Sequence, residues 1–534
     1  MKRIAAILFL LLASAAFAAP PKLVVVVSID QFPSDYLTRF DNVLGDDGFK
    51  RLEREGTWFV NAAYPYATTF TGPGHASIGT GHTPSESGIV GNNWYDRATH
   101  ARMYCAADPH VDPILSSTTD AKVRDANRMS PLNLDAASLG DRLQEHDALS
   151  KVYSVSLKDR AAILLGGRKA WGAFWFDPRA GFTTTTYYRH RLEALLREFN
   201  AGLAARVKAH PSWTLDPRTR GARVTDPESL RDKKTDRYGL GTSFDHPIGS
   251  IEAFTYTPYG NELVLDFARQ IIRRESLGAD DHPDLLFVSL SSNDYFGHLF
   301  GPDSWEAADG VVRTDRQIAA FLHELRARFG SNVTFALTAD HGVQSIPAIA
   351  KAKDPSAPAG LVDFNNAQSP GRNAVEKMVG LNGIFWFEEP AFYLDVPPNA
   401  DAEAAKRAYR DAVKTIEGVS DAFTNSELML SEGASESREK KAMRLSFRAD
   451  RSGDVLITLK PGYIWKSSVA ATHGQPVPDD QRVPVILWGK GIRHGDEPCR
   501  TREASPLDIA RTLGQILGVD AGGAHSNDLK CARQ

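Results

Sequence analysis

Residues 23–29, with the sequence LVVVVSI, are apolar almost without interruption and mostly β-branched. A run of this kind, without alternating polar residues, is typical of a strand that is buried on both faces of a parallel sheet. The segments 151–157, 284–290, 332–338 and 483–488 have a similar character. We therefore expect these five strands to form one buried sheet.

Amphipathic segments of helical period separate and follow these strands. They span residues 188–199, 262–277, 314–329 and 506–517. Buried strands that alternate with helices predict an α/β fold that is doubly wound, with a mostly parallel sheet.

Three polar segments interrupt this alternation, at 211–249, 344–382 and 431–441. We interpret them as surface insertions. Insertions at the carboxyl ends of strands border the ligand crevice in open α/β sheets, so these segments are expected to form a cap over a site.

The composition is that of an ordinary globular protein. The 534 residues are 42% hydrophobic and 24% charged, which allows a large core and argues against a disordered or fibrous chain. Length alone suggests about three domains at about 150 residues each. With 62 basic and 66 acidic side chains the net charge is −4, so the chain lacks the basic surface expected of a nucleic-acid-binding protein.

The first 18 residues have the pattern of a secretory signal peptide. A basic head precedes the apolar segment 4–13, and Ala16-Phe17-Ala18 is a small-x-small cleavage sequence. The apolar segment is shorter than the roughly 20 residues that a membrane-spanning helix needs. We expect cleavage near Ala18, a periplasmic or secreted protein and no stable membrane anchor.

The three cysteines are too few and too far apart for a disulfide-rich scaffold or a thiolate zinc site. Cys499 and Cys531 could pair near the C-terminus and leave Cys105 free. The sequence leaves this pairing open.

Ionisable side chains follow four of the expected strands. They are Asp30 after 23–29, Lys158 and Arg160 after 151–157, Asp294 and His298 after 284–290, and Asp340 and His341 after 332–338. One carboxylate at a strand end is commonly a helix cap or a turn residue. Four strand ends that meet at one edge of a sheet predict a site instead.

The residue types favour a catalytic metal site. Together with His473, the aspartates and histidines supply oxygen and nitrogen ligands without sulfur, which suits Zn²⁺ or Mn²⁺. Asp294 and His298 are four residues apart, so a helical turn places both on one face. Asp340 and His341 are adjacent and point in opposite directions on extended backbone. They therefore either serve two different metal centres or are brought to one centre by a twist at the strand end. Five other histidines are expected to be ordinary surface or core residues: His100, His110, His146, His190 and His210.

Thr71, in the segment 71–75 with the sequence TGPGH, is the candidate nucleophile. A threonine hydroxyl becomes nucleophilic when a divalent cation helps to remove its proton. Gly72 and Pro73 open an expected helix at 75–80, and a helix N-terminus attracts anions such as phosphate. This segment alone leaves open the alternative that Thr71 is only an N-cap.

Six motifs are similar to those of the alkaline phosphatase superfamily. They read VVVVSIDQF, TFTGPGHASIGTGHTPSESGIVGNNWYD, SLKDRAAILLGG, SNDYFGHLFGPDS, TADHGV and ATHGQP. They lie in the family's order between residues 24 and 476. The chain most resembles the bacterial periplasmic phosphate-irrepressible alkaline phosphatases that use a threonine nucleophile, with nucleotide pyrophosphatase/phosphodiesterases as near relatives.

This resemblance implies two zinc ions per chain. The first would be bound by Asp30, Thr71, Asp340 and His341, and the second by Asp294, His298 and His473. Thr71 would attack phosphorus and form a phospho-threonine, which a water on the second zinc would hydrolyse. Asn92 would hold a non-bridging phosphate oxygen.

In the phosphomonoesterase branch, the resemblance implies that Lys158 and Arg160 contact the phosphoryl oxygens. A monoester dianion carries more charge on its non-bridging oxygens than a diester, so two cations favour the monoester. We expect an alkaline phosphatase with broad specificity for small-molecule phosphate monoesters. A phosphodiesterase or nucleotide pyrophosphatase on the same scaffold is the alternative.

Two other interpretations have less support. A sulfatase would need Cys or Ser as the source of its formylglycine, where this chain has Thr71. A catalytically silent metal-binding protein would be expected to lack a ligand or the nucleophile, and none of them is missing. Because the motifs span the chain, we expect one catalytic domain over 19–534, enlarged by the three insertions, in a monomer or weak oligomer.

Overall fold

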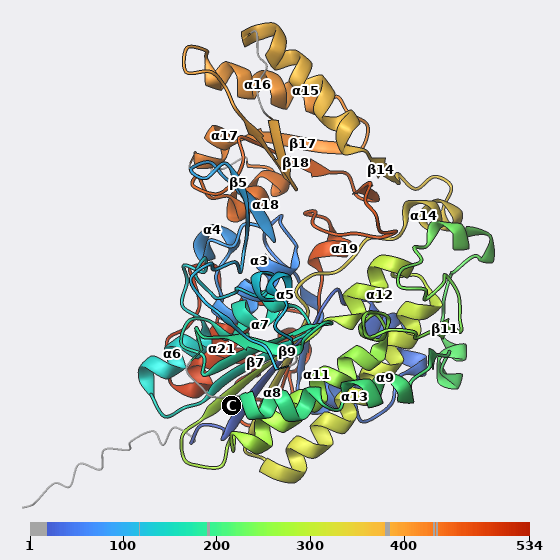
Figure 1. Cartoon of the computed structure of the whole chain (residues 1–534), viewed down its shortest axis with the longest axis vertical. Helices are drawn as coiled ribbons and strands as arrows, with labels where there is room; N and C mark the ends of the chain where they lie inside the picture. Colours follow the sequence, from blue (N-terminus) through green and yellow to red (C-terminus); the bar gives the residue numbers. More distant parts are fainter. Residues whose placement is uncertain (1–18, 117, 189–192, 380–384, 431–432, 434–435) are drawn as a thin grey trace, which may run out of the picture.

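The computed structural model describes residues 19–116, 118–188, 193–379, 385–430, 433 and 436–534 (Figure 1). Its centre is a nine-stranded sheet with the strand order β2-β20-β13-β1-β12-β7-β8-β9-β6. The signal peptide expected at 1–18 lies outside the described residues. No helix of the described part combines the length and the apolar character needed to cross a membrane.

Five neighbouring strands of this sheet are parallel. They are β13 (Val333–Thr338), β1 (Leu23–Ile29), β12 (Asp284–Leu290), β7 (Val152–Ser156) and β8 (Gly172–Asp177). The strands expected at 23–29 and 284–290 have the observed bounds, and those expected at 151–157 and 332–338 are slightly shorter. β8 is not among the expected strands, because its aromatic sequence GAFWFD lacks a β-branched run.

The edges of the sheet are antiparallel. The fifth expected strand, 483–488, is β20 (Val485–Gly489), which runs antiparallel to β13 and to the edge strand β2 (Thr57–Phe59). On the other edge, β9 (Gly181–Thr185) and β6 (Pro113–Ile114) are also antiparallel to their neighbours. The centre of the sheet is therefore parallel, as expected. The antiparallel direction of β20 was not predicted, because an apolar run alone does not reveal the direction of a strand.

Helices cover both faces of the sheet, which confirms the doubly wound α/β fold. Successive residues of β1 point to opposite faces, so Val25 and Val27 enter one core cluster and Val24 and Val26 enter another. The first cluster includes α11 (Pro258–Arg274) and α13 (Trp305–Phe329). The second includes α3 (Thr71–Thr80), α7 (Asp159–Gly166) and α21 (Leu507–Leu517).

The expected helices are present with shifted ends. Those expected at 262–277, 314–329 and 506–517 are α11, α13 and α21. The helix expected at 188–199 is α8 (Glu193–Asn200), and residues 189–192 lie outside the described part. α13 begins earlier than expected because the Ser304 hydroxyl caps it, accepting the N–H of Ala307 at 3.0 Å.

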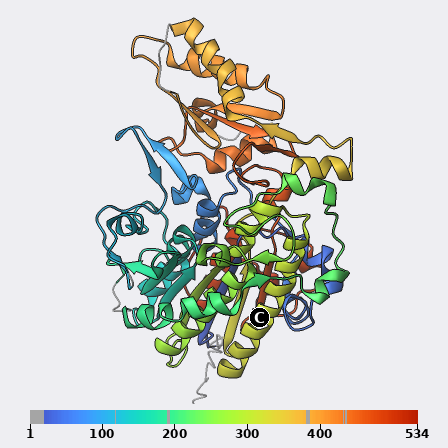
Figure 2. The ribbon, with the colours of Figure 1, turned by 45° about the vertical axis from the view of Figure 1, so that its right-hand side comes forward.

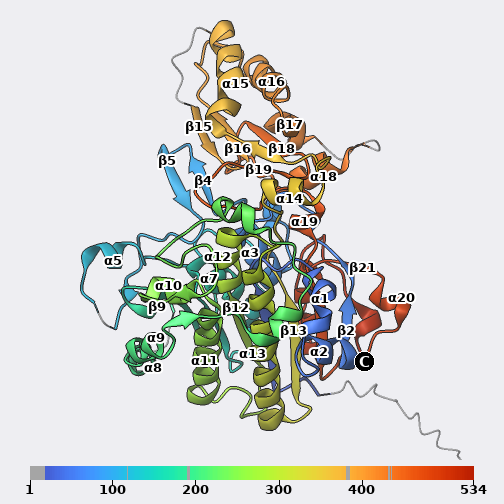
Figure 3. The ribbon, with the colours of Figure 1, turned by 90° about the vertical axis from the view of Figure 1, so that its right-hand side faces the viewer.

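A second lobe stands at the top of Figures 1, 2 and 3, beyond one edge of the central layers. It contains the antiparallel sheet β15 (Phe385–Glu388), β16 (Ala391–Leu394), β18 (Val455–Leu459) and β17 (Val419–Thr424), with α15 (Phe364–Val379) and α16 (Ala402–Val413). Phe392, Tyr409 and Ile457 belong to its own core cluster. The insertion expected at 344–382 contributes α15 to this lobe. The four strands and α16 lie outside the segments that were expected to form a cap. The division into one domain with insertions stays a prediction.

The insertion at 211–249 is anchored by buried polar contacts. The Trp213 indole donates a hydrogen bond to Asp309 of α13 at 2.7 Å. The Lys234 ammonium pairs with Glu306 of the same helix at 3.0 Å and with Asp226 at 2.7 Å. Because buried charges need such partners, this segment is an integral part of the fold.

The cysteine pairing that the sequence leaves open is resolved by the structure. Cys499 and Cys531 form a disulfide bond that ties the C-terminal tail to the short helix α20 (Glu497–Arg500). Cys105 is free and buried, and burial raises the pKa of its thiol to about 12. Its thiol is therefore protonated and unreactive at neutral pH.

Candidate active site

The carboxyl ends of four parallel strands bring the expected ionisable groups together. Asp30 follows β1 directly, and Lys158 is the N-cap residue of α7, which follows β7. Asp340 and His341 follow β13, and α12 (Ser292–Phe300) carries Asp294 after β12. Parallel strands end at the same edge, so side chains that are far apart in the sequence meet there.

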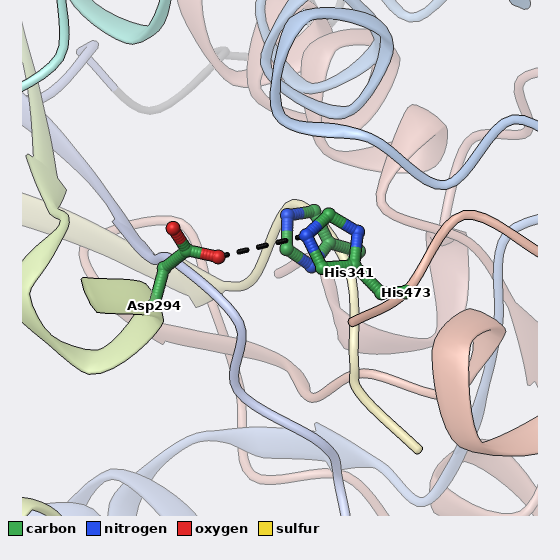
Figure 4. Close-up of side chains that lie close together, drawn as sticks. All are labelled: Asp294, His341 and His473. Atoms are coloured by element: carbon green, nitrogen blue, oxygen red, sulfur yellow. Dashed lines mark ion pairs between the residues drawn. The ribbon is translucent and has the colours of Figure 1, made fainter. Parts of the chain in front are cut away.

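Asp294, His341 and His473 form the first cluster (Figure 4), in which one ligand atom from each residue lies within 4.8 Å of the others. His473 Nε2 lies 3.6 Å from Asp294 Oδ1, and the rings of His341 and His473 stack with their centres 3.4 Å apart. His298 Nε2 lies 3.1 Å from the same Asp294 oxygen. The expected set of Asp294, His298 and His473 therefore comes together, with His341 beside it.

Asp30, Asp340 and His75 form the second cluster, again within 4.8 Å. His75 is not among the expected ligands. One ring nitrogen, Nδ1, hydrogen-bonds to the Thr71 carbonyl oxygen at 2.9 Å, and Nε2 hydrogen-bonds to Ser289 at 3.1 Å. Burial lowers the pKa of His75 to about 4, so the ring is neutral and its Nδ1–H is the donor to Thr71. With both nitrogens engaged, His75 supports the nucleophile helix.

His341, a member of the first cluster, also faces the second cluster. Its Nε2 is 3.5 Å from Asp30 Oδ1 and 3.3 Å from Asp340 Oδ2. Its Nδ1 hydrogen-bonds to the Gly342 carbonyl oxygen at 3.0 Å, which leaves Nε2 as the atom that faces the carboxylates. The expected set of Asp30, Asp340 and His341 is thus also brought together, and one imidazole borders both clusters.

The expected set of Asp30, Asp340 and His341 fits a divalent cation. Asp30 Oδ1, Asp340 Oδ2 and His341 Nε2 are buried and have no hydrogen-bond partner. Burial raises the pKa of Asp340, and the nearby Asp30 carboxylate raises it further, because two buried like charges repel. A cation relieves this repulsion and satisfies the orphaned atoms, and oxygen and nitrogen donors without sulfur suit zinc or manganese.

Lys158 links the two clusters electrostatically. Its ammonium nitrogen lies 2.6 Å from Asp30 Oδ2, 2.6 Å from Asp294 Oδ2 and 3.3 Å from Thr71 Oγ1. Burial alone would lower the pKa of this lysine, but the Asp294 and Asp30 carboxylates raise it. Conversely, burial disfavours the Asp294 anion, while His298 and Lys158 hold the pKa of Asp294 well below its usual range. Lys158 therefore stays charged beside the candidate nucleophile.

Thr71 is the first residue of α3, not its N-cap. The N-cap position belongs to Phe70 in extended conformation, and the helix starts four residues before the expected position 75. The alternative that Thr71 serves only as a cap is therefore wrong. Its hydroxyl accepts hydrogen bonds from Lys158 and, at 3.4 Å, from Arg160.

Asn92 directly precedes β4 (Asn93–Asp96), and Tyr104, which contacts Arg160, ends β5 (Ala101–Tyr104), so both lie at the same end of one hairpin. The Asn92 side-chain carbonyl accepts the Gly72 N–H at 2.7 Å, which leaves its NH₂ group for another acceptor. The Tyr104 hydroxyl accepts from Arg160 at 3.3 Å and donates to Asp159. Sequence patterns gave no signal for Tyr104 beyond its closeness to the asparagine motif.

The same hairpin reaches the second lobe (Figure 3). Tyr95 stacks on Trp386 with ring centres 5.1 Å apart. Arg102 forms a bidentate pair with Glu388, with distances of 2.7 and 2.8 Å. The lobe therefore contacts the hairpin that carries Asn92 and Tyr104 at its other end.

Comparison with known proteins agrees with this geometry. Residues 24–477 match the family described as "Type I phosphodiesterase / nucleotide pyrophosphatase". The chain belongs to this family. The resemblance expected from the motifs is thus confirmed.

Several relatives of this phosphodiesterase-family chain are named alkaline phosphatases. Alkaline phosphatase PhoV of Synechococcus elongatus is 34% identical over 516 residues, which cover 94% of this chain and 90% of the relative. Alkaline phosphatase PafA of Elizabethkingia meningoseptica is 33% identical over 514 residues, 93% of this chain and 92% of the relative. The crystal structure of PafA superposes with a TM-score of 0.87 at 30% identity and covers 97% of this chain and 100% of its own.

A second crystal structure of PafA is of a variant changed at one threonine, one asparagine, one lysine and one arginine. In PafA the threonine and the asparagine are separated by the same number of residues as Thr71 and Asn92 here. The lysine and the arginine have the spacing of Lys158 and Arg160. This member of the phosphodiesterase family thus has the same four residue types, with the same spacing within the threonine–asparagine pair and within the lysine–arginine pair.

Proposed function

We propose that this chain is an alkaline phosphatase that hydrolyses small-molecule phosphate monoesters with Thr71 as the nucleophile. One observation carries the proposal: Lys158 Nζ and Arg160 Nη2 lie 3.3 and 3.4 Å from the Thr71 hydroxyl oxygen. A buried lysine and a half-buried arginine at a nucleophile make a place for a doubly charged phosphoryl group. The alkaline phosphatase names of the relatives support the same activity.

Two divalent cations, assigned here as zinc, belong to this proposal. Asp30, Asp340, His341 and Thr71 would hold one ion, and Asp294, His298 and His473 would hold the other. When bound, such ions stabilise negative charge on oxygen and lower the pKa of a hydroxyl group.

The chain's own residues then carry out the transfer. Thr71 Oγ forms a bond to phosphorus as the ester bond to the leaving group breaks, and the alcohol departs. Water next cleaves the phospho-threonine, which releases inorganic phosphate and restores the hydroxyl. Overall one ester and one water give one alcohol and one phosphate.

The surrounding donors orient the phosphoryl group. Thr71 lies at the N-terminus of the ten-residue helix α3, where the positive end of the helix dipole favours an anion. Asn92 can donate from its NH₂ group because Gly72 occupies its carbonyl oxygen. Lys158 and Arg160 would contact the non-bridging oxygens.

The proposal also includes the exported, periplasmic location that is expected from residues 1–18.

The decisive experiment compares kcat/KM for p-nitrophenyl phosphate and for bis-p-nitrophenyl phosphate. We expect a clear preference for the monoester, because only its dianion uses both cations fully. A clear preference for the diester would replace the proposal by the alternative, a phosphodiesterase or nucleotide pyrophosphatase.

Removal of the metal ions should abolish this activity. Treatment with EDTA is expected to lower the phosphatase rate at least about 100-fold, because the buried carboxylates lose the cations that organise them. Zn²⁺ added in excess of the chelator should restore the rate, and Mg²⁺ should not, since histidine nitrogens are poor magnesium ligands. Full activity after chelation would contradict a metal site, and rescue by Mg²⁺ alone would contradict zinc.

A further inference from the structure

We propose that Gln31 is a positioning residue that joins the two metal clusters and fixes the Asp294 carboxylate for one ion; this rests on the proposed two-zinc function. Gln31 follows Asp30 directly and is 1% exposed. Its side-chain Nε2 donates to Asp294 Oδ1 at 2.9 Å. Its backbone N–H donates to Asp340 Oδ1 at 3.1 Å. One residue thus contacts a carboxylate of each cluster.

The backbone of Gln31 has an uncommon conformation. Its φ of 56° lies in the left-handed region, which glycine adopts most easily and which costs other residues free energy. Three other non-glycine residues of the described part share this conformation, His100, Tyr238 and Ser276, and all three are exposed. Gln31 is the only one of these four described residues that is buried. Strain of this kind is tolerated where a side chain or a backbone group has a specific role.

The fold makes room for this side chain. Gly297 lies on α12 three residues after Asp294, and a Cβ atom there would come within 1.9 Å of Gln31 Oε1. The Gln31 amide can therefore lie close to α12 and reach the carboxylate. The glycine explains why a long polar side chain fits between β1 and α12.

The hydrogen bond determines how the Asp294 carboxylate is oriented. Lys158 contacts Oδ2 of this residue, and Gln31 contacts Oδ1, so both oxygens have a fixed partner. Groups that hydrogen-bond to a ligand orient it, and their loss typically weakens metal binding about 10- to 100-fold. The contact to Asp340 comes from the backbone and survives any change of side chain. The side chain of Gln31 should therefore affect the ion held by Asp294 more than the ion held by Asp340.

The test measures zinc affinity directly, by competition of the folded full-length enzyme with a chromophoric chelator. Gln31→Met keeps the length of the side chain and removes the donor. Gln31→Gly removes the side chain and accepts the left-handed backbone without strain. In both variants we expect one zinc to bind about 10- to 100-fold more weakly and the other to stay within about threefold of the wild type.

Gln144→Met is the matched control. Gln144 also uses both ends of its amide, since it donates to the Ser150 carbonyl oxygen and accepts from the Trp171 indole at 3.2 Å. It lies in helix α6 (Leu139–His146), and its partner Ser150 precedes the amino end of β7, away from the site, so both zinc affinities should stay unchanged. Circular dichroism confirms that each variant is folded, and Gln31→Gly decides alone if Gln31→Met does not fold.

Two results would overturn the inference. They are wild-type affinity for both ions in Gln31→Gly, whatever Gln31→Met shows, and equal weakening of both ions. A wild-type enzyme that binds no zinc would instead contradict the proposed function, so the two failures are distinguishable.

Discussion

Replacement of Thr71 by alanine is expected to lower kcat/KM for p-nitrophenyl phosphate by about 10⁴-fold or more. The variant lacks the only hydroxyl that we place between the Lys158 and Arg160 side chains. Alanine is the best helix former and suits the first position of α3, so folding should be preserved. Steady-state kinetics and acid trapping of a phosphorylated enzyme measure the effect, and no phospho-enzyme should form.

Thr80→Ala is the control for this experiment. Thr80 ends the same helix, and its hydroxyl donates to the Ala76 carbonyl oxygen at 2.7 Å. That hydroxyl has no contact with the clusters, so activity should stay within about threefold of the wild type. Thr71→Ser keeps a hydroxyl and should retain much of the rate. Undiminished turnover in Thr71→Ala would rule out the threonine mechanism.

The double variant Lys158→Ala with Arg160→Ala should convert a monoesterase into an enzyme with little preference between ester classes. A hydrogen bond to a charged group contributes about 1.5–3 kcal/mol, so two of them amount to about 10²- to 10⁴-fold in kcat/KM for the monoester. A diester carries less charge on its non-bridging oxygens and should lose less than about tenfold. The ratio of the two kcat/KM values is the measurement.

Arg160→Ala alone separates substrate binding from metal organisation. Lys158 also pairs with Asp30 and Asp294, whereas Arg160 contacts Thr71 and Tyr104. The single variant should therefore shift the ester preference in the same direction as the double variant, by about half as much on a logarithmic scale. Lys169→Ala serves as the control, because this lysine pairs with Glu145 on the surface. Equal losses for both ester classes would contradict the assigned role.

The sequence predicts the centre of the fold well because burial leaves a strong local pattern. β1 and β12 have the expected bounds, since apolar runs buried on both faces end where ionisable residues begin. β8 and the second-lobe strands give no such pattern, and β16 pairs with β18 across a long separation in the sequence. The direction of β20 also depends on packing and connections, which a local pattern does not contain.

In the candidate site, too, some features follow from the sequence and others only from the packing. The motifs predict Asp30, Thr71, Asp294, Asp340 and His473 as a group, because residue types at strand ends limit the possible chemistry. They do not predict that His341 borders both clusters or that His75 supports the helix of Thr71. Gln31 directly follows a predicted ligand, yet only its left-handed backbone and its contacts indicate a role.

The sequence by itself determined the α/β class, the family and the kind of chemistry, because these depend on periodic burial and on the identities of a few ionisable residues. Only the tertiary structure decided which side chains meet. Asp30, Asp294, Asp340 and His473 are successively 264, 46 and 133 positions apart in the chain, and they meet because of the strand order of the sheet. The disulfide between Cys499 and Cys531 was decided in the same way, since pairing requires proximity that spacing alone does not establish.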